Sequence, residues 1–226
     1  MNKAGIDPKS IDAVLVTHEH SDHIAGLAPF LKKFKSVLYT HEGCADVLRN
    51  TLRNGAVNLS EIKCFQNRFQ IGDIEVDFFP VPHDSCFCFG YTFQNGAAKI
   101  SLATDLGRVT PQILDKMCSS QIVLLESNHD LVKLNNNTKY PTFLKRRIAG
   151  SRGHLSNAST SLAVYELAKC NVQQVILAHL SEENNSPMLA YENVKRFLAN
   201  KGLTEGVDIS VDIALQNEVS LVFQVD

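Results

Sequence analysis

The sequence contains no apolar run long enough to cross a membrane. Its longest apolar runs, such as residues 122–125 and 175–178, are far shorter than the roughly 20 residues that a membrane-spanning helix needs. The polar opening from Met1 to Ser10 also lacks the apolar core of a secretory signal peptide. We therefore expect a cytoplasmic protein that does not associate with membranes.

The chain has six cysteines but no Cys-x-x-Cys pair. Several of them stand inside apolar stretches such as residues 85–90, where a thiol behaves as a small hydrophobic group. Because disulfides are uncommon in the reducing cytoplasm, reduced and mostly buried thiols are expected. The six are Cys44, Cys64, Cys86, Cys88, Cys118 and Cys170.

The composition is that of a folded globular protein. Of the 226 residues, 44% are hydrophobic and 20% are charged, and this length is ample for a buried core. We find no internal repeat, low-complexity segment or linker. A single domain over residues 1–226 is expected.

Short apolar runs alternate along the chain with segments of helical spacing. Residues 13–17 and 122–125 have the composition of buried strands, and residues 22–34 have the apolar spacing of a helix. Asn95-Gly96 predicts a hairpin between strands at 87–93 and 98–103. The alternation predicts α/β packing. Further strands are expected at 37–39, 74–79, 175–178, 207–213 and 219–225, and helices at 41–53, 111–117, from Pro141, from Ser156 or Asn157 to Lys169, and at 187–200.

The clearest chemical signal is His18-Glu19-His20-Ser21-Asp22-His23, which follows the first predicted strand. In extended backbone, residues two apart face the same side, so His18 and His20 are placed to bind one cation while Asp22 and His23 turn toward a second. The alternative is an exposed polar loop, but three histidines within six residues is far beyond ordinary usage. The motif predicts two adjacent metal sites.

Three other candidate ligands, His83, Asp105 and His179, each follow a predicted strand. Taken singly, either histidine is as readily a hydrogen-bonded core or surface residue, and Asp105 a turn aspartate. Functional groups gather at the carboxyl ends of strands in open sheets, because the loops there converge on a crevice. Their shared position favours a common site.

This order of ligands, His-x-His-x-Asp-His followed by a lone His, a lone Asp and a final His, resembles the metallo-β-lactamase-fold hydrolases. The resemblance implies a four-layer αββα sandwich that holds two divalent metal ions. It also implies that His18, His20 and His83 bind the first ion, that Asp22, His23 and His179 bind the second, and that Asp105 bridges them.

Finer motifs across nearly the whole chain resemble the YycJ/WalJ-type exonucleases, which implies a DNA exonuclease acting from the 5′ end. Relatives usually begin with strands that precede the equivalent of Gly5-Ile6, so the first sheet is expected to be incomplete at its N-terminal side. The motifs are Glu126-Ser127-Asn128-His129-Asp130, Tyr140-Pro141, Arg147-Ile148, Gly153-His154-Leu155-Ser156-Asn157, and His179-Leu180-Ser181 with Asn184-Asn185.

A ligand set of imidazoles and carboxylates without thiolate suits zinc or manganese. Two cations that share a solvent oxygen lower its pKa and supply a hydroxide nucleophile, which Asp22 is placed to orient. His154 is the candidate for protonating the leaving group, with a capping-loop histidine as the alternative. Glu126 is either a partner of a metal-binding histidine or a carboxylate at a helix start.

Residues 131–165 contain six lysines and arginines and no carboxylate. This excess of cations favours contact with nucleic-acid phosphates, although the solvated face of a helix is the alternative. The candidate phosphate contacts are Lys145, Arg146, Arg147, Arg152 and Asn157. His41 and His129 are expected to be structural or exposed, and the phenylalanines at 78, 79, 87, 89 and 93 to serve packing rather than base stacking.

The leading hypothesis is a two-metal phosphodiesterase acting on DNA. The metal motif alone is equally compatible with a small-molecule hydrolase of the same fold, such as a lactamase or a glyoxalase II-like thioesterase. An inactive binding module is a third reading. A diiron oxidoreductase is disfavoured, because such proteins usually replace one of these histidines with a carboxylate. The basic segment favours the nuclease, since a neutral lactam gains little from six cations.

Overall fold

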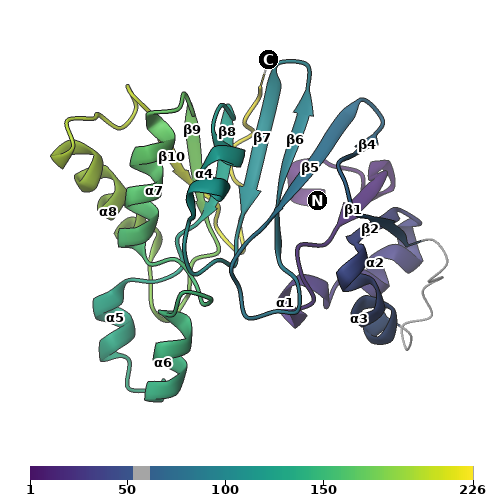
Figure 1. Ribbon diagram of the computed structural model, residues 1–226, viewed down its shortest axis with the longest axis horizontal. Coiled ribbons are helices and arrows are strands. Elements are labelled where there is room, and N and C mark those ends of the chain that lie inside the picture. Colours follow the sequence, from purple (N-terminus) through teal and green to yellow (C-terminus); the bar gives the residue numbers. More distant parts are fainter. Residues whose placement is uncertain (53–61, 226) are drawn as a thin grey trace.

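A computed structural model describes residues 1–52 and 62–225 and contains two β-sheets (Figure 1). In the larger sheet the strand order is β10-β9-β8-β7-β6-β5-β4, with β4 to β7 antiparallel and β7 to β10 parallel. The smaller sheet is parallel, in the order β1-β2-β3. The strands are β1 (Ala13–Leu15), β2 (Val37–His41), β3 (Lys63–Phe65), β4 (Phe69–Ile71), β5 (Ile74–Pro80), β6 (Phe89–Asn95), β7 (Ala98–Ala103), β8 (Ile122–Glu126), β9 (Gln174–Ala178) and β10 (Ser210–Ile213).

The helices begin where the sequence supplies side-chain caps. The hydroxyls of Thr110, Ser156 and Ser186 accept hydrogen bonds from the first turns of α4, α7 and α8, respectively. No helix in the described part of the chain is long and apolar enough to cross a bilayer. The α-helices are α1 (Ser21–Ile24), α2 (Leu27–Phe34), α3 (Glu42–Leu52), α4 (Pro111–Met117), α5 (Leu131–Asn136), α6 (Thr142–Ile148), α7 (Asn157–Ala168) and α8 (Pro187–Asn200), and 3-10 turns cover Asn2–Ala4 and Pro8–Ser10.

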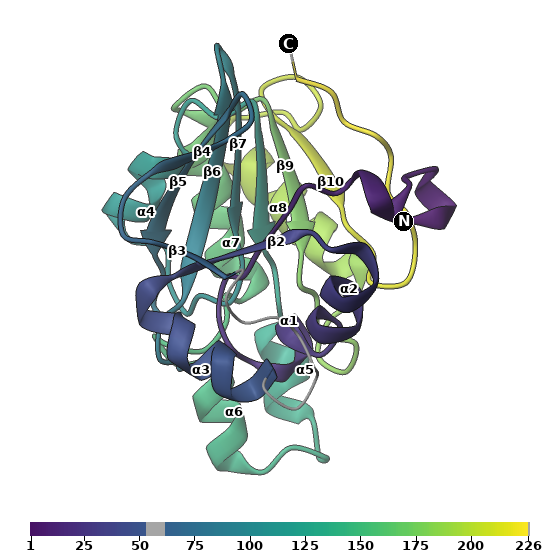
Figure 2. The same cartoon turned by 90° about the vertical axis from the view of Figure 1, so that its right-hand side faces the viewer.

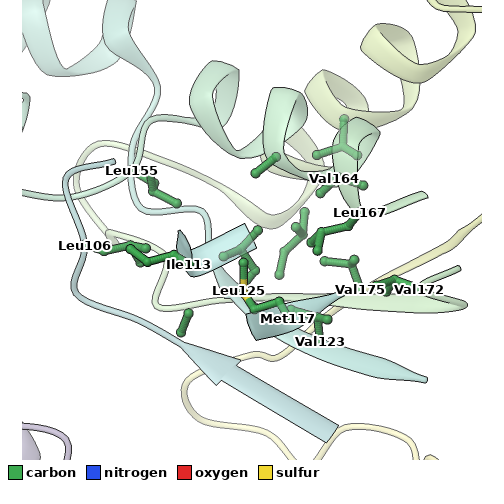
Figure 3. Close-up of a cluster of buried hydrophobic side chains, with 14 of the residues drawn as sticks. Leu106, Ile113, Met117, Val123, Leu125, Leu155, Val164, Leu167, Val172 and Val175 are labelled. Atoms are coloured by element: carbon green, nitrogen blue, oxygen red, sulfur yellow. The ribbon is translucent and has the colours of Figure 1, made fainter. Parts of the chain in front are cut away.

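One hydrophobic core lies between the larger sheet and the helices α4, α7 and α8. Figure 3 shows Val123 and Leu125 of β8 facing Val164 and Leu167 of α7, with Met117 of α4 beside them. All five side chains are almost fully buried. This core fixes the central parallel strands, whose carboxyl ends carry several of the candidate ligands.

A second core lies on the other side of the larger sheet. It joins Leu31 of α2, Leu38 of β2 and Leu48 of α3 to Val76 of β5 and Tyr91 of β6. The layers therefore run helix, sheet, sheet, helix, which confirms the expected αββα sandwich (Figure 2).

Most predicted elements are present, with shifted ends. The helix expected over residues 22–34 is divided into α1 and α2, and the helix expected over 41–53 is α3, whose predicted end at Arg53 lies outside the described residues. The hairpin at Asn95-Gly96 is confirmed, and Gly96 adopts the left-handed backbone that such a turn requires. The three-residue strands β3 and β4 were not predicted from the sequence.

Two predictions were wrong. Residues 219–225 form no strand and are largely exposed, since no described strand offers them a backbone partner. Cys118 and Cys170 form a disulfide between the ends of α4 and α7, whereas Cys44 and Cys88 are free and buried and Cys64 and Cys86 are free and exposed. The pair is 52 residues apart, so only the packing of α4 beside α7 brings it together.

We predict that Leu167→Ala lowers the free energy of unfolding by about 2–5 kcal/mol, because it opens a cavity in the first core. Leu162→Ala, on the exposed face of the same helix, is the matched control and should change it by less than about 0.5 kcal/mol. Urea denaturation followed by circular dichroism measures both. Equal losses in the two variants would contradict the placement of this core.

Candidate metal centre

The loop after β1 directs two histidine rings to one point. Thr17 Oγ1 lies within hydrogen-bond distance of Nδ1 of His18 (3.1 Å) and Nδ1 of His23 (3.3 Å), so the Nε2 atom of each ring faces away from the threonine. His20 precedes α1, and Asp22 and His23 lie within it. The sequence motif is therefore split by a helix start, which turns Asp22 and His23 away from the extended backbone.

His83 completes a group of three histidines with His18 and His20, whose ligand atoms lie within 4.8 Å of one another. His83 Nδ1 lies 3.1 Å from the carbonyl oxygen of Gly153, and its Nε2 lies 3.3 Å from His20 Nδ1. Gly153 itself packs against the end of α6, where a Cβ would stand 2.2 Å from the Arg147 carbonyl oxygen, so glycine is required at this position.

Asp22, His23 and His179 form a second group with the same spacing. Asp22 Oδ2 lies 3.6 Å from His23 Nε2 and 3.9 Å from His179 Nε2. Asp105 stands between the two groups, since its carboxylate oxygens lie 3.2 Å from His23 Nε2 and 3.9 Å from His83 Nε2. The structure thus brings all seven predicted ligands together in the predicted grouping.

The donor atoms suit divalent cations. His18 Nε2 is buried and has no hydrogen-bond partner among the described residues. Burial lowers the pKa of His18 to about 4, so its imidazole is neutral at physiological pH and keeps a free lone pair. Burial alone would raise the pKa of Asp105, but His23 and His179 hold it well below its usual range. Unprotonated nitrogen and oxygen donors of this kind are those that zinc and manganese accept.

Glu126, at the end of β8, is fully buried and accepts four hydrogen bonds. Its Oε1 accepts from Nδ1 of His154 (2.8 Å) and of His179 (2.7 Å), and its Oε2 accepts from the backbone amides of Leu106 (3.1 Å) and Leu155 (3.0 Å). Of the two roles left open by the sequence, Glu126 therefore has the contacts of a partner to the predicted ligand His179. Because Nδ1 of His179 is held, its Nε2 faces Asp22.

Glu126 also sets the charge of its two histidines. Burial alone would lower the pKa of His179, but the hydrogen bond and negative charge of Glu126 outweigh burial and raise it to about 9. The pKa of His154 is raised for the same reason. The His154 ring lies 5.1 Å from that of His83 and 5.4 Å from that of His179, so it stands beside the candidate ligands.

Asp105 and His179 both have left-handed backbone, with φ of 58° and 56°. Residues with a Cβ adopt this conformation at a cost, and such residues concentrate at functional sites. His179 directly follows β9 and Asp105 lies two residues after β7, both strands of the larger sheet.

Three of the four cations that the sequence predicts to contact phosphate have partners within the protein. Arg147 forms an ion pair with Asp84, the guanidinium of Arg152 donates to the carbonyl oxygen of His83, and Lys145 Nζ donates to the carbonyl oxygen of Asn135. Arg146 is exposed on α6 and has no partner among the described residues. Helices α5 and α6 extend away from both sheets (Figures 1 and 2), which leaves Arg146 open to solvent.

Asn157, the fifth predicted phosphate contact, is 1% exposed. Its amide pairs reciprocally with that of Asn185 and its oxygen accepts from Ser127 Oγ, so its polar atoms are bound within the protein. His129 is buried, which agrees with a structural role. Two carboxylates from other parts of the chain form ion pairs with cations of the basic segment: Asp84 with Arg147 and Glu183 with Lys139. These pairs offset part of the positive charge that residues 131–165 carry.

Sequence reasoning missed Thr17 and Asp84, which support the centre from its edges. Each is adjacent in sequence to a predicted ligand, His18 or His83, and this adjacency is the signal that could have found them. Gly153 was noted within a motif, but its contact with His83 follows only from the fold.

Comparison with known proteins agrees with this geometry. The family model of the beta-lactamase superfamily domain matches residues 2–180. The chain is 33% identical over 204 residues to exodeoxyribonuclease YycJ of Bacillus anthracis, covering 90% of this chain and 77% of that protein. It is 34% identical over 206 residues to exodeoxyribonuclease WalJ of Streptococcus pneumoniae, covering 90% and 76%.

The fold matches a solved structure as well. The metallo-β-lactamase fold protein YhfI of Bacillus subtilis superposes with a TM-score of 0.68 at 16% identity, covering 93% of this chain and 78% of that one. Together with the family model and the two relatives, this similarity shows that the chain belongs to the metallo-β-lactamase superfamily of hydrolases, in the family of the YycJ and WalJ proteins.

Proposed function

We propose that this protein is a two-metal phosphodiesterase that degrades DNA from the 5′ end in the cytoplasm. The observation that carries the proposal is the convergence of seven candidate ligands in two groups with Asp105 between them. The DNA substrate is supported by the two relatives, both named exodeoxyribonucleases. The direction of degradation rests on the resemblance of the sequence motifs alone.

His18, His20 and His83 would hold one ion, and Asp22, His23 and His179 the other, with Asp105 shared. Two bound cations, zinc or manganese, would lower the pKa of a water molecule and offset the negative charge of the phosphate. His18 and His83 present neutral nitrogens for this purpose, since burial lowers the pKa of both.

Two side chains are placed to handle protons. The Asp22 carboxylate is 65% exposed at the mouth of the centre, where it can accept a hydrogen bond from an attacking water and orient it. His154 Nδ1 is held by Glu126, which leaves Nε2 to donate a proton to the leaving oxygen. The raised pKa of His154 keeps a proton available for that step.

We predict that Asp105→Ala abolishes the release of nucleotides from linear duplex DNA, because it removes the carboxylate common to both groups. The parent protein, supplied with manganese, should release label from the 5′ end before label from the 3′ end. Activity of the variant within tenfold of the parent, with unchanged circular dichroism, would contradict the assignment.

Elemental analysis provides an independent measure. The parent should retain about two equivalents of divalent metal and Asp105→Ala fewer. The two-metal site would be ruled out if the folded parent, after metal supplementation, held less than half an equivalent of divalent metal. Faster turnover of a lactam or thioester than of any nucleic acid would favour the small-molecule hydrolase instead.

We predict that Glu126→Gln weakens zinc binding about 10–100-fold. Both oxygens of Glu126 accept hydrogen bonds, and the amide nitrogen of a glutamine could not accept those that one of them receives, so the candidate ligand His179 would be held less firmly. Competition with a chromophoric chelator measures the affinity. Glu205→Gln is the matched control, because Glu205 also accepts a hydroxyl and a backbone amide but lies by α8 and β10, away from the centre. Equal affinities for both variants would show that Glu126 does not orient the ligands.

We predict that Arg146→Ala lowers the slope of log affinity against log salt by about one for duplex DNA, since one phosphate contact is lost. Filter binding in calcium buffer across a salt series measures the slope. Arg196→Ala, an exposed cation on α8, is the control and should leave it unchanged. Parallel slopes for all three proteins would remove Arg146 from the DNA path.

A further inference from the structure

A pocket of about 480 Å³ opens beside the candidate metal centre. Its volume lies in the range of small-ligand sites. His83 lines the pocket on one side and belongs to the first ligand group on the other. A substrate whose phosphate lies at the centre therefore has this pocket within reach of its neighbouring groups.

The pocket wall carries an aromatic side chain that is not used for packing alone. Phe87 is 45% exposed, although the sequence predicted a packing role for it. One edge of its ring rests on the start of α3, where a Cβ at Gly43 would stand 2.7 Å from the ring. The absence of a side chain at position 43 lets the ring lie this close to α3, while much of the ring stays exposed.

Two other aromatic rings lie near Phe87. Phe87 and Phe89 are parallel to within 3°, with centroids 6.5 Å apart, and His41 lies 5.9 Å from Phe87 and 4.4 Å from Phe89. Phe89 and His41 also line the pocket, and Phe89 is buried in the second core. The pocket thus presents a flat, pre-formed aromatic wall.

Arg152 and Ser85 are two of the polar residues that line the pocket. Arg152 lines the pocket, and its Nε and Nη2 both donate to the His83 carbonyl oxygen, which fixes the guanidinium plane. Ser85 Oγ is buried and has no partner among the described residues. A flat apolar wall with an unpaired hydroxyl and a guanidinium fits a planar heterocycle with polar edges better than it fits an alkyl chain.

We propose that this pocket receives the base of the terminal nucleotide, stacked on Phe87, while the adjoining phosphodiester lies at the metal ligands. The inference rests on the proposed nuclease function and adds a contact to the base. Stacking on an aromatic ring accepts any base, because every base has a π-face. The enzyme would then discriminate for the presence of a terminal base and not for its identity.

The test compares two duplexes that differ only in whether the 5′-terminal nucleotide carries a base or is abasic. The parent should degrade the duplex with the base roughly tenfold faster in kcat/KM. Phe87→Leu keeps the bulk but removes the flat face, so it should lose this preference, whereas Phe87→Tyr should keep it. Leu162→Ala, on the exposed face of α7, is the control and should behave as the parent does.

A binding measurement separates the two proposals. A 5′-terminal 2-aminopurine should lose fluorescence when it binds the parent in calcium buffer, and Phe87→Leu should abolish this loss. Equal degradation of both duplexes by the parent would overturn the pocket assignment and leave the nuclease intact. If the parent degraded neither duplex, the proposed nuclease function would be wrong. If the 2-aminopurine fluorescence also stayed unchanged on binding to the parent, the proposal that the pocket receives a base would be wrong as well.

Discussion

The buried carboxylate of Glu126 accepts hydrogen bonds from three different loops at the end of β8. A buried charge is costly unless it is fully hydrogen-bonded, and here each oxygen has two donors. In return, the loop after Asp105, the loop containing His154 and the loop containing His179 are held to one point. The positions of the surrounding ligands therefore depend on this single anionic anchor.

The centre also joins the two sheets. His18, His20 and His23 come from the segment after β1 of the smaller sheet, whereas Asp105 and His179 follow strands of the larger one. Tyr91 of β6 donates to the Val16 carbonyl oxygen at 2.5 Å, next to the start of the histidine motif. The packing of the second core thus sets the distances between ligands that come from the two sheets. A change that loosens this core would therefore also disturb the geometry of the centre.

The ligands could be predicted from sequence because they lie in the segments that follow the apolar runs of β1, β5, β7 and β9. The parallel arrangement of β7, β8 and β9 then brings their ends together. The cation and amide contacts could not be predicted, because Arg147, Arg152 and Asn157 meet partners far away in sequence. Residues 219–225 show the same limit: apolar content favours a strand, but only a neighbouring strand can complete one.

The left-handed backbone at Asp105 and His179 has an evolutionary consequence. Glycine adopts this conformation without strain, so replacing either residue by glycine would relax the local backbone while deleting a donor atom. Stability and activity thus favour different residues at the same two positions. Laboratory selection for heat resistance alone, without a screen for turnover, would tend to erode these two donors before the others.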